Sequence, residues 1–273
     1  MSPYRLALRT VLLGRPRTVL AVLVIAGSLC ALDLFAGHIA TTRARLEYRA
    51  VIGERLGHLA ITRSGRTRDI GAPLFDNVEA ATIRRIVEGR PGVALVLPQM
   101  SLAGMATNGE RSALFRGEGI DGSSPADAPG KLKAGVRHGI AVSAGQARSL
   151  GLRNGSNVTL AGAAPHTRAS PLHAEVVDIF STAELSADAR SVLMPFEMAQ
   201  SLLDTELTER FVVFLSNAAQ LEEKRDELRA ALRAGGVAAD VRTWPEQSPS
   251  FSQEDKTSKL AFDSVAAMAF SVV

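Results

Sequence analysis

Cysteine is almost absent from this 273-residue sequence, in which Cys30 is the only one. No disulfide can therefore form within the chain, and no cysteine-based metal site can be built. Because Cys30 lies inside a long hydrophobic run, the more polar remainder of the chain contains no thiol. A thiol-free domain suits an oxidising compartment outside the cytoplasm.

Aromatic residues and clustered positive charge are also scarce. Aromatics make up 5% of the chain, and the formal net charge is only +3. The excess of arginine is spread along the sequence, with no run of five or more basic residues. Proteins that bind nucleic acids usually cluster basic charge and place aromatics within it. The composition therefore predicts no nucleic-acid partner.

Motifs that carry catalysis or metal binding are missing as well. The chain contains no HExxH, no GxSxG and no GxxxxGK[ST]. Arg116–Asp121 reads RGEGID, whose spacing is wrong for a phosphate loop and predicts a tight turn. No two histidines are four residues apart, and His166 and His173 are expected on a surface loop; the other three are His38, His58 and His138. The aspartates lack the spacing of a calcium loop: Asp121, Asp127, Asp178 and Asp188. We expect no catalytic, cofactor-binding or metal-binding residues, and therefore no enzyme.

A long hydrophobic run, Val19–Gly37, contains a single ionisable residue, Asp33. A helix of about 20 apolar residues is needed to cross a bilayer, so this run predicts a membrane span. Asp33 lies near its end, where a carboxylate can reach the headgroups; the alternative is a buried partner inside a helix bundle. A signal peptide would have a shorter apolar core followed by a cleavage site. Here the run continues into a basic helical stretch, residues 38–49, which favours a retained anchor.

Arginines flank this span on both sides and give a slight bias toward a cytoplasmic N-terminus. Four precede it and three follow it: Arg5, Arg9, Arg15 and Arg17, then Arg43, Arg45 and Arg49. The stretch Tyr4–Leu13 is either a solvated turn or a helix lying in the membrane interface. A second apolar run, Leu260–Val273, is too short to span, and we expect it to be the start of a second membrane helix in a longer protein.

Strands and short helices alternate between the two apolar runs. Helices are predicted at Asn77–Glu88, at Ala144–Leu150 capped by Ser143, after Pro195, and at Asn217–Ala234 capped by Ser216. Strands are predicted at Leu56–Arg63, Val93–Leu97 (ended by Pro98), Leu102–Thr107, Ser112–Gly117, Ile140–Val142, Asn157–Ala161, Glu175–Phe180, Ser191–Met194, Phe211–Leu215 and Val237–Thr243. Asn108–Gly109 is a hairpin signal between the third and fourth of these strands.

The predicted fold class is α+β, a mixed α/β extracytoplasmic domain of two lobes, one inserted in the other, preceded by a transmembrane helix. The predicted divisions are a cytoplasmic amphipathic segment (1–17), a transmembrane helix (18–38), a stalk helix (39–55) and a periplasmic core domain (56–250). Within the core domain, residues 56–99 and 205–250 form the first lobe and residues 100–204 the inserted lobe. Residues 251–273 form a second stalk and the start of a second transmembrane helix.

Four segments, taken in order, resemble one family. Leu6–Gly27 is similar to the opening of MacB/LolC/FtsX-type ABC transporter permeases. Gly139–Gly162, with the sequence GIAVSAGQARSLGLRNGSNVTLAG, and Val176–Leu203 resemble successive parts of the extracytoplasmic domain of that family. Val237–Phe251 resembles its return toward the second membrane helix. The resemblance therefore extends over nearly the whole chain.

The resemblance implies a periplasmic core domain between the first two of four membrane helices, in the bacterial inner membrane. It implies a permease that contacts membrane lipid, dimerises with a second copy or a paralogue, and works with a separate ABC ATPase subunit. A periplasmic partner protein is compatible with it, and no cofactor is implied. The implied function is mechanotransmission, in which cytoplasmic ATP hydrolysis drives export or release of a lipoprotein, lipid or drug.

Two other functions remain open on the sequence alone. One is a membrane-anchored binding or sensor module without transport activity. The other is an anchored enzyme, which would require a pocket with convergent polar groups. Three further membrane helices and the cytoplasmic loop that the family uses to contact its ATPase are not in this sequence.

Overall fold

The computed structural model describes residues 16–65, 74–121, 129–130, 132, 138–163, 170–181, 190–248 and 251. The chain divides into two compact units, of which the larger is the domain Tyr48–Gln247. The other unit contains the N-terminal helix, and each unit is described by itself. The predicted amphipathic stretch Tyr4–Leu13 and the second apolar run Leu260–Val273 lie outside the described residues.

The N-terminal helix α2 (Pro16–Tyr48) contains the predicted membrane span. At 1.5 Å per residue its length is about 50 Å, which exceeds a hydrocarbon core of about 30 Å. Among the described residues it is the one helix long and apolar enough to cross a membrane. The hydroxyl of Ser28 donates to the carbonyl of Val24 (2.8 Å), and Thr41 donates to Gly37 (2.9 Å). These polar groups are satisfied within the helix, as a lipid environment requires. The limits 18–38 and 39–55 stay predictions.

The domain begins with a π-helical turn, η1 (Arg49–Gly53), followed by β1 (Leu59–Arg63). Ala50 and Val51 of the turn are buried. A backbone hydrogen bond between residues five apart closes this turn: the N–H of Glu54 donates to the carbonyl of Arg49 at 2.8 Å. Single π-helical turns are rare and often mark functional positions.

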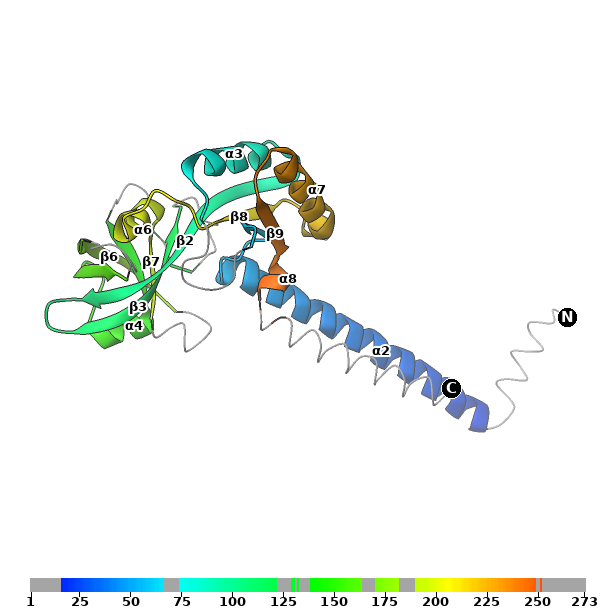
Figure 1. Cartoon of the computed structure of the whole chain (residues 1–273). Coiled ribbons are helices and arrows are strands. Elements are labelled where there is room, and N and C mark those ends of the chain that lie inside the picture. Colours follow the sequence, from blue (N-terminus) through cyan, green and yellow to red (C-terminus); the bar gives the residue numbers. More distant parts are fainter. Residues whose placement is uncertain are drawn as a thin grey trace. The chain divides into compact units, whose positions relative to one another are not determined.

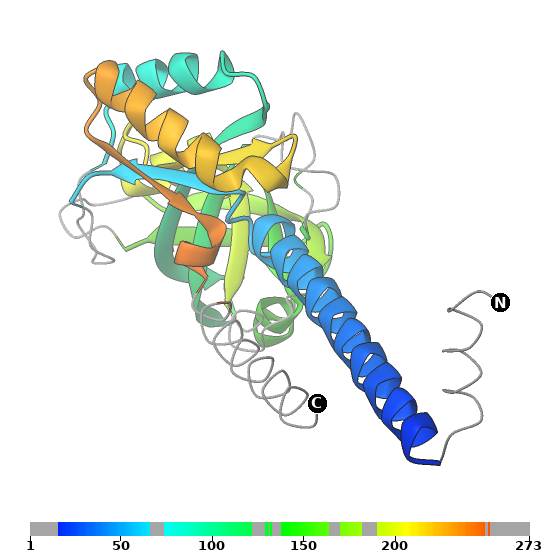
Figure 2. The same ribbon diagram turned by 90° about the vertical axis from the view of Figure 1, so that its right-hand side faces the viewer.

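An open four-stranded sheet forms the part of the domain nearest both of its chain ends. Its elements are β1, α3 (Asn77–Glu88), β2 (Val93–Thr107), β8 (Arg210–Leu215), α7 (Leu221–Ala234) and β9 (Ala239–Thr243). The strand order is β2-β8-β1-β9, with all pairs antiparallel. Figure 2 shows α3 and α7 side by side over this sheet. The order of elements is therefore β-α-β, repeated once.

One apolar core lies between these two helices and the sheet. Ile83 and Val87 of α3 and Leu228 and Leu232 of α7 pack against the strand residues Leu59, Ile61, Phe211, Val213 and Val241. The spacing of three or four residues in the helices and two in the strands places each set on one face. Asp76 begins α3 with a capping box: its side chain accepts from the N–H groups of Val78 and Glu79, and the Glu79 side chain accepts from the Asp76 N–H.

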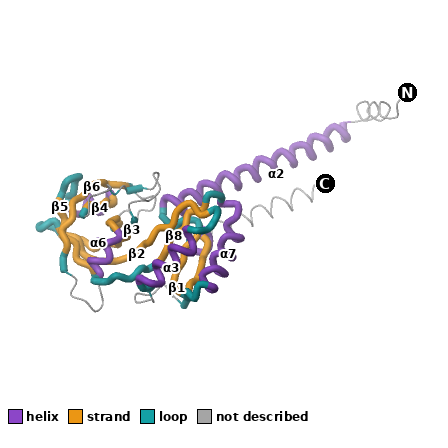
Figure 3. The backbone as a smooth tube through the Cα atoms, turned by 90° about the horizontal axis from the view of Figure 1, so that it is seen from above, coloured by secondary structure: helices purple, strands orange, loops and turns teal. Residues whose placement is uncertain are grey.

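The remaining strands close into a barrel with the outer half of β2. These strands are β3 (Ser112–Ile120), β4 (Gly139–Ser143), β5 (Asn157–Gly162), β6 (Leu172–Phe180) and β7 (Ser191–Pro195). The order β3-β7-β4-β6-β5-β2 is closed by pairing of β2 with β3. Two of these pairs, β3–β7 and β4–β6, are parallel. Closure leaves the barrel without free strand edges. Figures 1 and 3 show these strands curling to form it.

Two short helices pack against the strands of the barrel: α4 (Ala144–Leu150) and α6 (Phe196–Leu203). Leu150 of α4 and Leu202 of α6 belong to the same buried core as Leu160, Val176 and Met194 of the strands. As predicted, Ser143 caps α4, accepting from the N–H of Gln146, and Gly151 ends it with a positive φ of 66°. The predicted hairpin is confirmed as β2–β3, joined through Asn108 and Gly109.

The mixed α/β class is confirmed, but the predictions for Pro98 and Ser216 were wrong. Pro98 does not end a strand, because β2 runs through it as one strand of 15 residues. There β2 pairs with β8, while pairing with β3 begins only at Gln99. Proline is tolerated where one edge of a strand has no partner. Ser216 does not cap the long helix: the Asn217 side chain caps a short 3-10 turn, η2 (Ala218–Gln220), before α7. The predicted lobe limits at 99/100 and 204/205 stay predictions.

Candidate functional site

The first and last strands of the domain are neighbours in the sheet. In the antiparallel pair β1–β9, Leu59 is opposite Thr243 and Ile61 is opposite Val241. Just outside this pair, the N–H of Trp244, which begins α8 (Trp244–Gln247), donates to the carbonyl of His58 at 3.0 Å. The chain therefore enters and leaves the domain through adjacent, directly bonded backbones.

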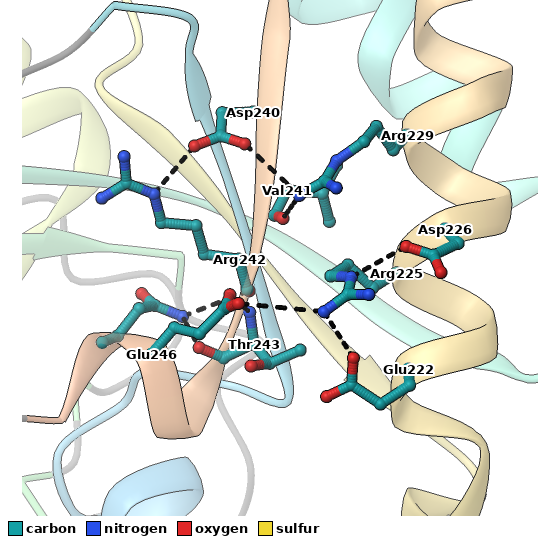
Figure 4. A network of polar contacts seen from close by, with 10 residues as sticks. Glu222, Arg225, Asp226, Arg229, Asp240, Val241, Arg242, Thr243 and Glu246 are labelled. Atoms are coloured by element: carbon teal, nitrogen blue, oxygen red, sulfur yellow. Dashed lines mark hydrogen bonds and ion pairs between the residues drawn. The ribbon is translucent and has the colours of Figure 1, made fainter. Parts of the chain in front are cut away.

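A polar network on the exit side ties α7 to β9 and α8 (Figure 4). Arg229 donates to the carbonyl of Val241 at 2.9 Å and lies 3.6 Å from Asp240. Glu246 accepts from the N–H of Thr243 at 2.9 Å. Arg225 pairs with Glu222, Asp226 and, at 3.8 Å, Glu246. Exposed ion pairs are individually weak, about 0–1 kcal/mol. The bond from Arg229 to the Val241 carbonyl is what fixes the exit segment to α7.

A second group of polar side chains lies inside the domain and is buried to a greater extent. We call it the junction cluster; its members are Arg55, Gln99, Glu118, Glu209 and Arg210. It brings together the segment after η1, the middle of β2, the end of β3 and the start of β8. These elements come from four distant parts of the sequence.

Arg55 is the member contributed by the entry segment. It is 6% exposed and has a φ of 53°, a left-handed conformation that non-glycine residues rarely adopt. Its Nη2 donates to the carbonyl of Gly130 at 3.2 Å and to that of Pro129. Its Nε is buried without a hydrogen-bond partner among the described residues. Two residues later, Gly57 has a φ of 64°, and a Cβ there would overlap the Val212 side chain.

The other members form a chain of hydrogen bonds across three strands. Gln99 donates from Nε2 to the carbonyl of Arg55 (3.4 Å) and accepts at Oε1 from Arg210 Nε (2.7 Å). The Nη2 of Arg210 donates to Glu118 Oε1 at 3.0 Å. Glu209 accepts from the N–H of Ser101. A side chain of β2 is therefore bonded both to the entry segment and, through β8, to β3.

Burial and charge act in opposite directions on Glu118. Burial raises the pKa of its carboxyl group, and the nearby guanidinium groups of Arg210 and Arg55 lower it. Burial also lowers the pKa of Arg55, whose guanidinium still stays charged at neutral pH because an arginine pKa is so high. Two cations face two carboxylates, so the buried charges are balanced in number. Removing one of these four charged side chains would leave an uncompensated charge.

The junction cluster lies where β2 passes from one apolar core to the other. Val96 belongs to the core of the open sheet, whereas Met100 and Leu102 belong to the core of the barrel. Pro98 and Gln99 lie between them. The junction cluster is thus the polar boundary between the two cores, and Arg55 is its member from the entry segment.

The structure changes the interpretation of the RGEGID stretch. Arg116–Asp121 is not a tight turn: residues 116–120 are the end of strand β3. Its glycines allow close packing, because a Cβ on Gly119 would overlap that of Ala199 on α6. Its glutamate, Glu118, is a member of the junction cluster. The backbone of this stretch is extended, so it cannot cradle a phosphate.

Of the two histidines predicted in a loop, the structure describes one. His173 lies on β6, with Nδ1 3.0 Å from Thr159 Oγ1, and not in a loop as predicted. His166, Asp127 and Asp188 lie outside the described residues. Within the described part of the chain, no three His, Cys, Asp or Glu side chains are grouped so that they could hold a metal ion. That the protein has no catalytic or cofactor site stays a prediction.

Comparison with known proteins gives similar structures only. No protein-family model matches the sequence, and no curated protein is similar to it. The extracellular domain of the noncanonic ABC-type transporter YknZ from Gram-positive bacteria matches 68% of this chain and 99% of its own, with 16% identity and a TM-score of 0.48. The periplasmic region of MacB from Actinobacillus actinomycetemcomitans matches 69% and 89%, with 12% identity and a TM-score of 0.49.

A permease-protein domain from Porphyromonas gingivalis matches 67% of this chain and 85% of its own, with 15% identity and a TM-score of 0.40. Identities of 12–16% and TM-scores below 0.5 do not by themselves decide what the chain does. The chain is similar in structure to extracytoplasmic domains of a transporter and of MacB, and the family that its sequence resembles includes MacB.

Proposed function

We propose that this chain is the permease component of an ABC transporter, with the domain Tyr48–Gln247 outside the cytoplasm. The observation that carries the proposal is the pairing of β1 with β9. A domain inserted between two consecutive membrane helices must begin and end on the side that faces the membrane. Adjacent first and last strands meet that requirement directly. The apolar helix α2 precedes β1, and an apolar run follows the exit segment.

The finer proposal is mechanotransmission. Movement of the membrane helices, driven by ATP hydrolysis on a separate ABC ATPase, would reach the domain through α2 and through the exit segment. The bonded entry and exit backbones would receive this movement together, because Trp244 and His58 are joined. In this proposal the permease lies in the bacterial inner membrane, contacts its lipid and acts as a dimer with a second copy or a paralogue. It drives export or release of a lipoprotein, lipid or drug, and a periplasmic partner protein fits the same scheme.

The direct test is ATP turnover by the purified complex. The full-length protein, isolated from its native membrane and placed in lipid nanodiscs, is expected to retain a subunit with a GxxxxGK[ST] phosphate loop and to hydrolyse ATP. Inserting Gly-Ser-Gly after Arg49, at the start of η1, should leave this subunit bound but abolish ATP-dependent substrate release or transport. The same insertion after Gly109, in the β2–β3 turn, is the control. A complex without ATPase, or transport unaffected by the first insertion, would contradict the proposal.

A further inference from the structure

Resting on the proposed function, we propose that Arg55 is the residue that couples movement of the entry segment to the barrel. It acts as a positioning residue, holding the segment between η1 and β1 against the boundary of the two cores. Three independent features of the structure support this role.

The first feature is that Arg55 contacts both parts of the domain. Its carbonyl accepts from Gln99 at the midpoint of β2, while its guanidinium donates to the carbonyls of Pro129 and Gly130. Those carbonyls follow β3, and Gly130 packs on the barrel side: a Cβ there would lie within 3 Å of Leu193 and Phe180. The entry segment is thereby bonded to the barrel, although in sequence it belongs next to the open sheet.

The second feature is the backbone of the entry segment. A π-helical turn, a left-handed arginine and a left-handed glycine follow one another between Arg49 and Gly57. Each is a conformation that the surrounding contacts must maintain, because the unconstrained chain rarely adopts it. A segment of this kind can change between discrete backbone states when the force on it changes, unlike a regular helix or strand.

The third feature is the incomplete pairing of the guanidinium. Arg55 Nε is buried and has no partner among the described residues, whereas Nη2 is shared between two carbonyls. Arg210, the first residue of β8, is by contrast bonded through both Nε and Nη2. Buried polar groups are normally satisfied. The unused donor of Arg55 fits a side chain that exchanges partners between two states of the domain.

The test measures the distance between the two parts of the domain. Spin labels are placed at Val78→Cys on α3 and Leu114→Cys on β3, both exposed, in the full-length complex with Cys30 and any other native cysteine replaced by serine. Distance distributions are recorded with and without ATP in nanodiscs. In the parent protein we expect a shift on ATP binding. With Arg55→Met we expect a broader distribution without ATP and loss of the shift.

The control is Arg90→Met: Arg90 lies between α3 and β2 and donates through Nη1 to Glu227 of α7 at 3.3 Å, so both residues of this bond belong to the open-sheet part of the domain. It should keep the parent distribution and shift. If Arg55→Met does not fold, as judged by Trp244 fluorescence, Arg55→Gly decides by the same criterion, since glycine suits the positive φ. Asp204→Gly is its control, because Asp204 is the other non-glycine residue with a positive φ among those that the structure describes.

The outcomes separate this inference from the proposed function. If the distance distribution of the parent complex did not change with ATP, this result would count against the proposed function. The width of the distribution without ATP would still decide the role of Arg55. A variant that lacks the guanidinium and yet matches the parent in the width without ATP would overturn the inference. If the parent complex responds to ATP, a variant without the guanidinium that shows the same ATP-dependent shift in distance would also overturn the inference.

Discussion

The N–H of Trp244 donates to the carbonyl of His58 at 3.0 Å, which joins the exit of the domain to its entry. His58 is also held by its neighbours on β8. His58 Nδ1 accepts from the N–H of Leu215 at 3.1 Å, and its ring meets that of Phe214 edge-on with centroids 6.2 Å apart. Trp244 is 6% exposed and is the only tryptophan in residues 1–273, so within this part of the protein its fluorescence reports unfolding at this point.

The entry strand should be essential for the stability of the open sheet. Leu59→Ala removes a fully buried side chain from its core, and we expect a loss of about 2–5 kcal/mol in the free energy of unfolding. Leu114→Ala makes the same change on the barrel surface, where the leucine is 63% exposed, and should cost less than about 0.5 kcal/mol. Urea unfolding followed by Trp244 fluorescence measures both. Equal losses would show that Leu59 is not buried as described.

Stability should fall as the pH drops through the ordinary pKa of histidine, 6.5, because of His58. Burial lowers the pKa of His58, so in mild acid the unfolded chain binds a proton that the folded domain does not. Protonation would also place a hydrogen on Nδ1, which accepts from Leu215. Glu118 contributes in the opposite direction, since its raised pKa makes the folded state the better proton acceptor.

His58→Asn isolates this effect, because Glu118 is present in both proteins and the asparagine oxygen can accept the same hydrogen bond. Unfolding free energies are compared between about pH 7.5 and pH 5.5, on either side of the histidine pKa. The variant should lose less stability over this range than the parent. His173→Asn, at an exposed position of β6, controls for the exchange itself, and its unfolding free energy at about pH 7.5 should lie within about 0.5 kcal/mol of the parent value. Parallel pH curves for the parent and His58→Asn would rule out His58 as the cause.

The RGEGID stretch gives a prediction about packing. Gly119→Ala should destabilise the barrel by about 1–3 kcal/mol, because the added methyl group overlaps Ala199 and forces α6 away from β3. Gly89→Ala, at the end of α3, adds the same methyl group 3.4 Å from the nearest atom, the Arg85 carbonyl oxygen, and should be tolerated. Thermal unfolding of both variants distinguishes them, and a tolerated Gly119→Ala would mean that α6 does not contact β3 so closely.

The capping box of α3 predicts a smaller effect. Asp76→Ala removes the acceptor for two helix N–H groups and should cost about 1 kcal/mol. Gln220 occupies the same position before α7 but makes no capping bond through its side chain, so Gln220→Ala should change little. Urea midpoints give both values. A neutral Asp76→Ala would indicate that the N-terminus of α3 is satisfied in another way.

Local signals in the sequence were sufficient for several elements. The helix Asn77–Glu88 and the helix Ala144–Leu150 lie at the residues predicted, because caps and apolar spacing are encoded within a few residues of each helix. The β2–β3 hairpin follows from Asn108–Gly109 in the same way. These features depend on residues that are close together in the sequence, so they can be predicted from the sequence alone.

Long-range features could not be predicted in this way. The barrel closes through β3–β7 and β4–β6, which pair residues separated by long stretches of chain. Arg55 carried no local signal at all: its partners are at positions 99, 129 and 130, and its left-handed φ is imposed by them. Pro98 gave a wrong prediction because a proline normally ends a strand. Only the pairing of β2 with its partner strands shows that Pro98 lies where one edge of β2 is unpaired.

The side of the membrane on which the domain lies is the claim on which the account depends most. Residues 1–273 contain one cysteine, so Cys30→Ser, with any cysteine in the rest of the full-length protein also replaced, gives a background in which single cysteines report topology. Leu114→Cys places a thiol on the exposed barrel surface, and Ser2→Cys places one before the membrane span. In spheroplasts, a membrane-impermeant maleimide should label Leu114→Cys at once and Ser2→Cys only after permeabilisation. Labelling in the reverse order would place the domain in the cytoplasm and contradict the permease account.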